Sequence, residues 1–154
     1  MVEYVETVGA AFQIQDDLLS LILDGQYAES RGILAEDIHE GKRTLMVLRT
    51  YWDEQVSKSS KERLVEILDK NTEDETLIRE AVAILNESGS IKYANEMART
   101  MVANAWEQLE PGLPELNDTS RQSKQYLQEL SEYLVDRDLW IKINFKLLGF
   151  WGFG

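Results

Sequence analysis

The stretch GAAFQIQDDLLS, residues 9–20, places two adjacent aspartates, Asp16 and Asp17, inside an otherwise apolar run. Apolar residues recur around this pair at spacings of three and four, which predicts an amphipathic helix from about Val2 to Leu23. No lysine or arginine precedes Arg31, so the pair has no basic neighbour nearby along the chain. The two acids therefore need either solvent or a bound cation to balance their charge.

Both aspartates share a face of this helix with residues one turn away. Residues four apart lie about one turn above each other, so Phe12, Asp16 and Ser20 form one row, with Gln13 and Asp17 beside it. Paired carboxylates suit Mg²⁺, which usually completes its octahedron with waters and substrate phosphate oxygens. Two solvated acids on a helix surface remain the alternative interpretation.

Composition and spacing predict an all-α fold. The chain has 154 residues, enough for one domain with its own core, and its two prolines, Pro111 and Pro114, lie together. Apolar residues recur at spacings of three and four almost everywhere else along the chain, which is typical of helices. The absence of cysteine excludes disulfides, zinc–thiolate sites and thiol catalysis. A net charge of −12 disfavours binding to nucleic acid and to anionic membranes.

The helices expected after the first one follow from the same spacing and from capping residues. After a loop over 25–43, they cover 44–55, 59–71 capped by Ser59 or Ser60, 73–88, 90–109 capped by Ser90, and 118–134. The helix at 44–55 runs through Leu45, Leu48 and Trp52, and Leu127, Leu130 and Leu134 are expected on the inner face of the last helix. Trp52, Trp106 and Tyr133 are expected in the core or in an interface.

The two ends of the chain carry little targeting information. The N-terminal sequence lacks the basic residues of a signal peptide, and no apolar run reaches the about 18 residues that span a membrane. A cytoplasmic protein without stable membrane insertion is the expectation. Residues 139–154 form a separate apolar tail, expected to pack on the core; an anchor at a membrane interface and readthrough sequence are the alternatives.

A second polar segment, EDIHEGKRTLMV, spans residues 36–47. Lys42 and Arg43 directly precede an expected helix, whose N-terminus favours anions. A lysine meets phosphate as a point charge and an arginine as a planar fork. The segment thus predicts phosphate contacts, unless both residues are simply solvated before the helix; the lone His39 is expected to have no catalytic role.

Four segments, in this order, resemble motifs of the trans-isoprenyl diphosphate synthase (polyprenyl synthetase) family. GAAFQIQDDLLS resembles the second aspartate-rich segment, F-Q-x-x-D-D-x-x-D, and EDIHEGKRTLMV resembles G-D-I-x-E-G-K-x-T-L-P. SGSIKYANEMARTMVANAWEQL resembles G-S-I-E-Y-A-x-x-x-A, and LQELSEYLVDRDL resembles L-x-x-L-A-x-Y-x-V-x-R-x. The resemblance covers residues 1–138 and is nearest to the geranylgeranyl and farnesyl types.

This resemblance implies the C-terminal half of the isoprenoid-synthase helical bundle. Family members hold Mg²⁺ and an allylic diphosphate between two aspartate-rich helices and condense it with isopentenyl diphosphate. The metals are needed because the leaving diphosphate must have its charge neutralised. Carried over, the resemblance assigns metal binding to Asp16 and Asp17, diphosphate binding to Lys42, Gln13 and Arg43, a pocket border to Phe12, and the organisation of the loop to Asp37.

The chain also departs from the family pattern. Ser20 stands where the third aspartate is expected, Arg31 is a displaced candidate for a second phosphate-binding cation, and no first aspartate-rich motif occurs. We therefore expect a truncated synthase that is inactive alone, with its Mg²⁺ site residual or ancestral. The partner is a homo-oligomer copy or the missing N-terminal half.

The alternative is a non-catalytic helical interaction or regulatory subunit. In the parent fold the first helix packs against helices that this chain lacks, so its apolar side needs another partner. We expect self-association or partner binding through the faces that contain Val5, Phe12 and Leu19.

Overall fold

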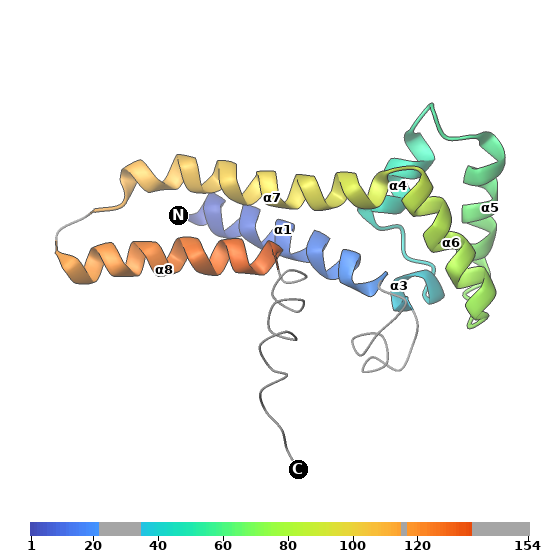
Figure 1. Ribbon diagram of the computed structural model, residues 1–154, viewed down its shortest axis with the longest axis horizontal. Helices are drawn as coiled ribbons and strands as arrows, with labels where there is room; N and C mark the ends of the chain where they lie inside the picture. Colours follow the sequence, from blue (N-terminus) through green and yellow to red (C-terminus); the bar gives the residue numbers. More distant parts are fainter. Residues whose placement is uncertain (22–34, 115–116, 137–154) are drawn as a thin grey trace, which may run out of the picture. The chain divides into compact units, whose positions relative to one another are not determined.

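The structure is a computed structural model that describes residues 1–21, 35–114 and 117–136. Within those ranges all regular structure is helical, as expected, and Figure 1 labels each helix. The helices are α1 (Val2–Ser20), α3 (Glu36–His39), α4 (Leu45–Trp52), α5 (Lys58–Asp69), α6 (Glu75–Glu87), α7 (Ser90–Leu109) and α8 (Asp118–Val135), with a 3₁₀ turn, η1 (Glu110–Gly112), after α7.

The chain divides into two compact units. The first contains Met1–Gln13 with Met97–Gly154, and the second contains Ile14–Glu96. Helices α1 and α7 each contribute to both units. The expected loop over 25–43 contains α3 in its described part, and the expected apolar tail 139–154 lies outside the described residues. Among the described helices, none is long and apolar enough to cross a membrane.

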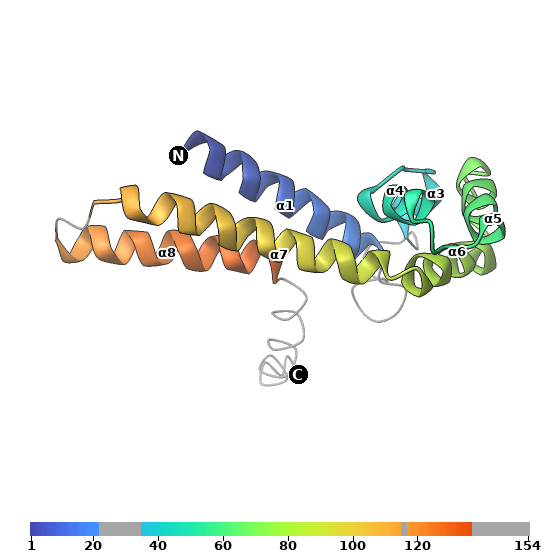
Figure 2. The same ribbon diagram turned by 90° about the horizontal axis from the view of Figure 1, so that it is seen from above.

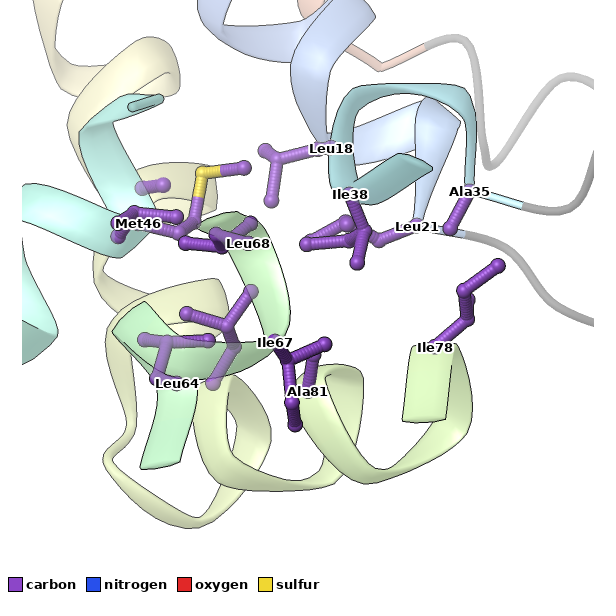
Figure 3. Packing of buried hydrophobic residues seen from close by; sticks show 13 residues of the cluster. Leu18, Leu21, Ala35, Ile38, Met46, Leu64, Ile67, Leu68, Ile78 and Ala81 are labelled. Carbon is purple, nitrogen blue, oxygen red and sulfur yellow. The ribbon is translucent and has the colours of Figure 1, made fainter. Parts of the chain in front are cut away.

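The second unit has one hydrophobic core, drawn in Figure 3. Its centre is the contact between α5 and α6, whose inward residues recur every three or four positions. The end of α1, together with α3 and α4, adds further apolar side chains. Fully or almost fully buried members are Ile38, Met46, Val47, Leu64, Ile67, Leu68, Ile78, Ala81, Leu85 and Ala94.

Side-chain caps set the starts of α5 and α6. The Ser57 hydroxyl accepts a hydrogen bond from the Ser60 backbone N–H, and the Asp74 carboxylate accepts one from the Thr76 N–H. The expectation that Ser59 or Ser60 caps α5 is therefore wrong. Three serines lie close together there, and the one with extended backbone, Ser57, takes the capping position.

A hydroxyl cluster joins α4 to the turn between α6 and α7. Thr50 donates to the Ser90 hydroxyl over 2.9 Å, and the Ser88 and Ser90 hydroxyls both donate to the Leu85 carbonyl over 2.8 Å. Ser90 was expected to cap α7 but is its first helical residue, and its hydroxyl points back to α6. Buried hydroxyls need such partners, so the cluster fixes this turn.

In the first unit, Tyr4 of α1 contacts both α7 and α8. Its hydroxyl lies 2.5 Å from the hydroxyl of Ser131 on α8, and its ring meets that of Trp106 on α7 edge-on, with ring centres 6.1 Å apart. Helices α7 and α8 run side by side in both views (Figures 1 and 2), and Arg99 of α7 pairs with Asp136 over 2.7 Å. Trp106 is buried, as expected.

Some expected inner faces are wrong. Leu48 and Trp52 on α4 are exposed, because α4 turns Met46, Val47 and Thr50 inward, so Trp52 is not in the core and its place in an interface stays a prediction. Alternative apolar stripes coexist on so short and apolar a helix, and packing selects one of them. On α8, Leu130 and Tyr133 are exposed, and the buried positions are Ser131 and Val135.

The core predicts a large difference between two leucines. Leu68→Ala removes a side chain that is 0% exposed and should lower the free energy of unfolding by about 2–5 kcal/mol. Leu48→Ala, the matched control at 46% exposure, should cost about 0.5 kcal/mol or less. Urea denaturation followed by circular dichroism measures both values, and equal losses would contradict this core.

Candidate functional site

Helix α1 holds Asp16 and Asp17 at the edge of the second unit. Gln15, Leu18 and Leu19 are buried on one side of the helix, which fixes its rotation. Asp16 and Asp17 are half-buried beside them. On the same helix Phe12 is half-buried and Gln13 exposed, but both belong to the first unit.

A buried carboxylate connects the end of α1 to the segment that carries Lys42. Ser20 lies one turn beyond Asp16, and its hydroxyl lies 2.7 Å from Asp37 Oδ2 and also 2.7 Å from the Asp17 backbone carbonyl oxygen, so its one proton is shared between these two acceptors. The other oxygen of Asp37 accepts from the Lys42 ammonium, also over 2.7 Å. Asp37 is buried, so both oxygens need partners, and these two donors supply them.

Lys42 is held by more than one contact. Its ammonium also lies 2.7 Å from Glu40 Oε2, and its backbone N–H donates to the Asp37 carbonyl over 2.9 Å. The hydrogen bonds that Lys42 donates to Asp37 and then to Glu40 raise the pKa of Lys42 above its ordinary value, against a smaller opposing effect of burial. Lys42 is therefore a fixed cation whose side chain is half exposed.

Gly41 sets the turn that delivers Lys42. Its φ of +67° lies in the left-handed region, and a Cβ built there would lie 2.5 Å from the Leu68 backbone oxygen. A side chain at this position would collide with α5. The glycine of the Glu-Gly-Lys sequence is therefore required by the steric fit of this turn against α5.

Arg43 and His39 lie against other partners. The Arg43 guanidinium reaches Asp69 of α5 and the Gly41 carbonyl, each over 2.5 Å, and His39 Nδ1 lies 3.1 Å from the Thr72 carbonyl. The structure thus joins Lys42 to α1 through Asp37 and connects Arg43 to α5. The diphosphate role of Arg43 stays a prediction.

The residues present are compatible with a Mg²⁺ site that the protein completes only in part. Within the described ranges, no cluster of three or more acidic or histidine side chains could hold a metal ion. Asp16 and Asp17 are the carboxylates on α1, and Mg²⁺ commonly uses one or two carboxylates with waters and phosphate oxygens. The Ser20 hydroxyl is engaged by Asp37 and by the Asp17 carbonyl and carries no charge, so it does not take the place of a third carboxylate.

Comparison with known proteins agrees with the helices and motifs. The model of the polyprenyl synthetase family matches residues 1–85. A short chain isoprenyl diphosphate synthase from Methanothermobacter thermautotrophicus is 35% identical over 137 residues, which cover 88% of this chain and 38% of that protein. A geranylgeranyl pyrophosphate synthase from Geoglobus acetivorans is 33% identical over 84% of this chain and 35% of its own length.

A solved structure gives the same result. The crystal structure of geranylgeranyl pyrophosphate synthetase from Pyrococcus horikoshii superposes with a TM-score of 0.69 at 32% identity, over 87% of this chain and 37% of that one. The chain thus belongs to the polyprenyl synthetase family. It spans little more than a third of the length of these relatives.

Two site features were not predicted from the sequence. Asp37 was assigned only a loose organising role, and the contact of Glu40 with Lys42 was not anticipated. The acid two residues before a lysine in Glu-Gly-Lys was the available signal for the second contact. The role of Asp37 depends on its contact with Ser20 of α1, which the local sequence does not predict.

Substitutions of Ser20 test the buried network. Ser20→Ala removes a hydrogen bond to a carboxylate and should lower the free energy of unfolding by about 1.5–3 kcal/mol. Ser20→Asp places a second carboxylate against Asp37 and should cost about 3–5 kcal/mol at pH 7. Like-charge contact raises the carboxyl pKa in the folded state, so this penalty should shrink as the pH falls from 7 to 5.

Urea denaturation at both pH values measures these effects. Ser123→Asp is the control, because Ser123 is exposed and its hydroxyl also donates to a backbone carbonyl of its own helix. It should change the free energy of unfolding by about 0.5 kcal/mol or less. A Ser20→Asp protein as stable as the wild type at pH 7 would contradict the network.

Proposed function

We propose that this chain forms the diphosphate-binding wall of a short-chain prenyl diphosphate synthase site. In this proposal Asp16 and Asp17 hold Mg²⁺ and Lys42 contacts the diphosphate of an allylic substrate. The family motif also names Gln13 and Phe12, which stay predictions, and Arg43 would have to leave Asp69 to bind the diphosphate. The observation that carries the proposal is the Ser20–Asp37–Lys42 network, which ties a fixed cation to the helix bearing the acid pair.

The charges of these residues suit a metal-bound diphosphate. Mg²⁺, when bound, neutralises the charge that develops on diphosphate as it leaves carbon. Lys42 supplies a second positive charge, and because Asp37 holds its ammonium, little reorganisation is needed when the anion binds. Asp16 and Asp17 are half-buried on α1, the helix that Ser20 connects to Asp37 and Lys42.

The proposal assigns these 154 residues binding rather than complete catalysis. Family members close their site with another helix, which carries the first aspartate-rich motif of the family. These 154 residues contain no motif of that kind besides the one at Asp16 and Asp17. Matched relatives are more than twice as long, which supports a requirement for further polypeptide. We propose that the chain alone does not condense isopentenyl diphosphate with an allylic diphosphate.

Calorimetric titration with inorganic diphosphate in the presence of Mg²⁺ tests the binding role. Lys42→Ala and Asp16→Ala should each weaken binding about tenfold or more, the loss expected for one charge-assisted contact. Lys58→Ala is the control, because this lysine side chain is 88% exposed on α5 and should leave affinity unchanged.

Two results would count against the proposal. If millimolar diphosphate produces no heat, the diphosphate site is ruled out and only the family relationship remains. Equal losses of affinity for Lys42→Ala and Lys58→Ala would indicate non-specific charge attraction. Arg43→Ala belongs in the same series: a loss as large as that of Lys42→Ala would mean that Arg43 leaves Asp69 to bind diphosphate.

The second candidate is a non-catalytic subunit that associates through α1. Val2 and Val5 are exposed large apolar residues on this helix, which favours a partner on that face. Leu19, expected on the same surface, is buried and drops out of this candidate.

Sedimentation velocity tests the association. The wild type should associate at about tens of micromolar, a range of modest association energy. Val5→Ser should shift the protein towards monomer, and Leu48→Ser, an exposed leucine on α4, should not. A stable wild-type monomer at that concentration would contradict the association candidate.

A further inference from the structure

The two carboxylates on Lys42 differ in how firmly they are held. The Asp37 side chain is 10% exposed and also accepts from Ser20, whereas the Glu40 side chain is 45% exposed. The structure describes one polar contact of the Glu40 carboxylate, which is the contact with Lys42. Asp37 is therefore the permanent partner and Glu40 the exchangeable one.

An exposed ion pair of this kind is weak. Solvent screens its charges, and ordering two long side chains costs entropy, so such pairs stabilise by little. An ammonium has three N–H donors, of which Asp37 and Glu40 each take one. An incoming phosphate oxygen carries more charge than a carboxylate oxygen and can replace Glu40 at small cost.

We propose that Glu40 is an internal competitor for Lys42: its carboxylate occupies the side of the ammonium that a phosphate oxygen takes, and it leaves when diphosphate binds. Asp37 stays in place throughout. This inference rests on the proposed role of Lys42 as a diphosphate ligand. Glu40 then lowers the affinity of the site in two ways, by occupying the donor and by repelling the anion.

Calorimetry with inorganic diphosphate and Mg²⁺ on the full chain tests the proposal. Glu40→Gln should lower the dissociation constant about two- to fivefold, the range that corresponds to one exposed ion pair. Glu36→Gln is the matched control, because Glu36 is an exposed glutamate at the start of α3, the short helix that Glu40 follows as its C-terminal cap, and its removal changes net charge equally. Glu36→Gln should give less than half of that gain.

A double variant locates the effect. In a Lys42→Ala background, Glu40→Gln should give no gain, because the competition requires the ammonium. Weaker binding by Glu40→Gln would make Glu40 a ligand and overturn the proposal, and so would an equal gain from Glu36→Gln. A persisting gain without Lys42 would overturn it as well.

The outcomes separate this inference from the proposed function. If the wild type binds diphosphate through Lys42 but Glu40→Gln changes nothing, the competitor role alone fails. If neither the wild type nor Glu40→Gln binds, the diphosphate site itself fails and the inference with it. Binding that becomes measurable only in Glu40→Gln would support both.

Discussion

The buried carboxylate of Asp37 is the interaction on which the candidate site depends. A carboxylate removed from water is strongly unfavourable unless each oxygen has a donor. Ser20 satisfies one oxygen from the end of α1, and Lys42 satisfies the other from the segment after α3. Both donors bind the same carboxylate, so the network connects Lys42 to the helix that carries the aspartate pair.

In the proposed site, this arrangement supplies a cation beyond the two motif carboxylates. The serine at position 20 brings no metal-binding charge, yet it keeps Asp37 available to Lys42. An aspartate at position 20 would place a second negative carboxylate against that of Asp37, and the two would repel each other. The network therefore connects the cation Lys42 to α1, the helix that bears the aspartate pair.

Much of the fold could be predicted from sequence, because helical spacing over long segments is a strong signal. The helices at residues 58–69, 75–87 and 90–109 appear near their expected positions, and the chain has the expected all-α fold. Details of the shorter helices were not predicted. Leu48 of α4 is exposed, and the N-terminal cap of α5 is Ser57 rather than Ser59 or Ser60. In both cases several local solutions were available and tertiary packing chose among them.

The site was predictable only in part. The motifs predict roles for Asp16, Asp17 and Lys42 that stay predictions, and the contact of Ser20 with Asp37, seventeen residues away, is not encoded by spacing. The family assignment came from the order of four segments and is supported by relatives of which this chain spans about a third.

Nuclear magnetic resonance of lysine side chains tests the central claim most directly. With labelled lysine, addition of Mg²⁺ and diphosphate together should produce a saturable shift of the Lys42 ammonium signal while that of Lys58 stays in place. Mg²⁺ alone should shift neither. A Lys42 signal that does not respond to Mg²⁺ with diphosphate would contradict the account, whatever the ancestry of the chain.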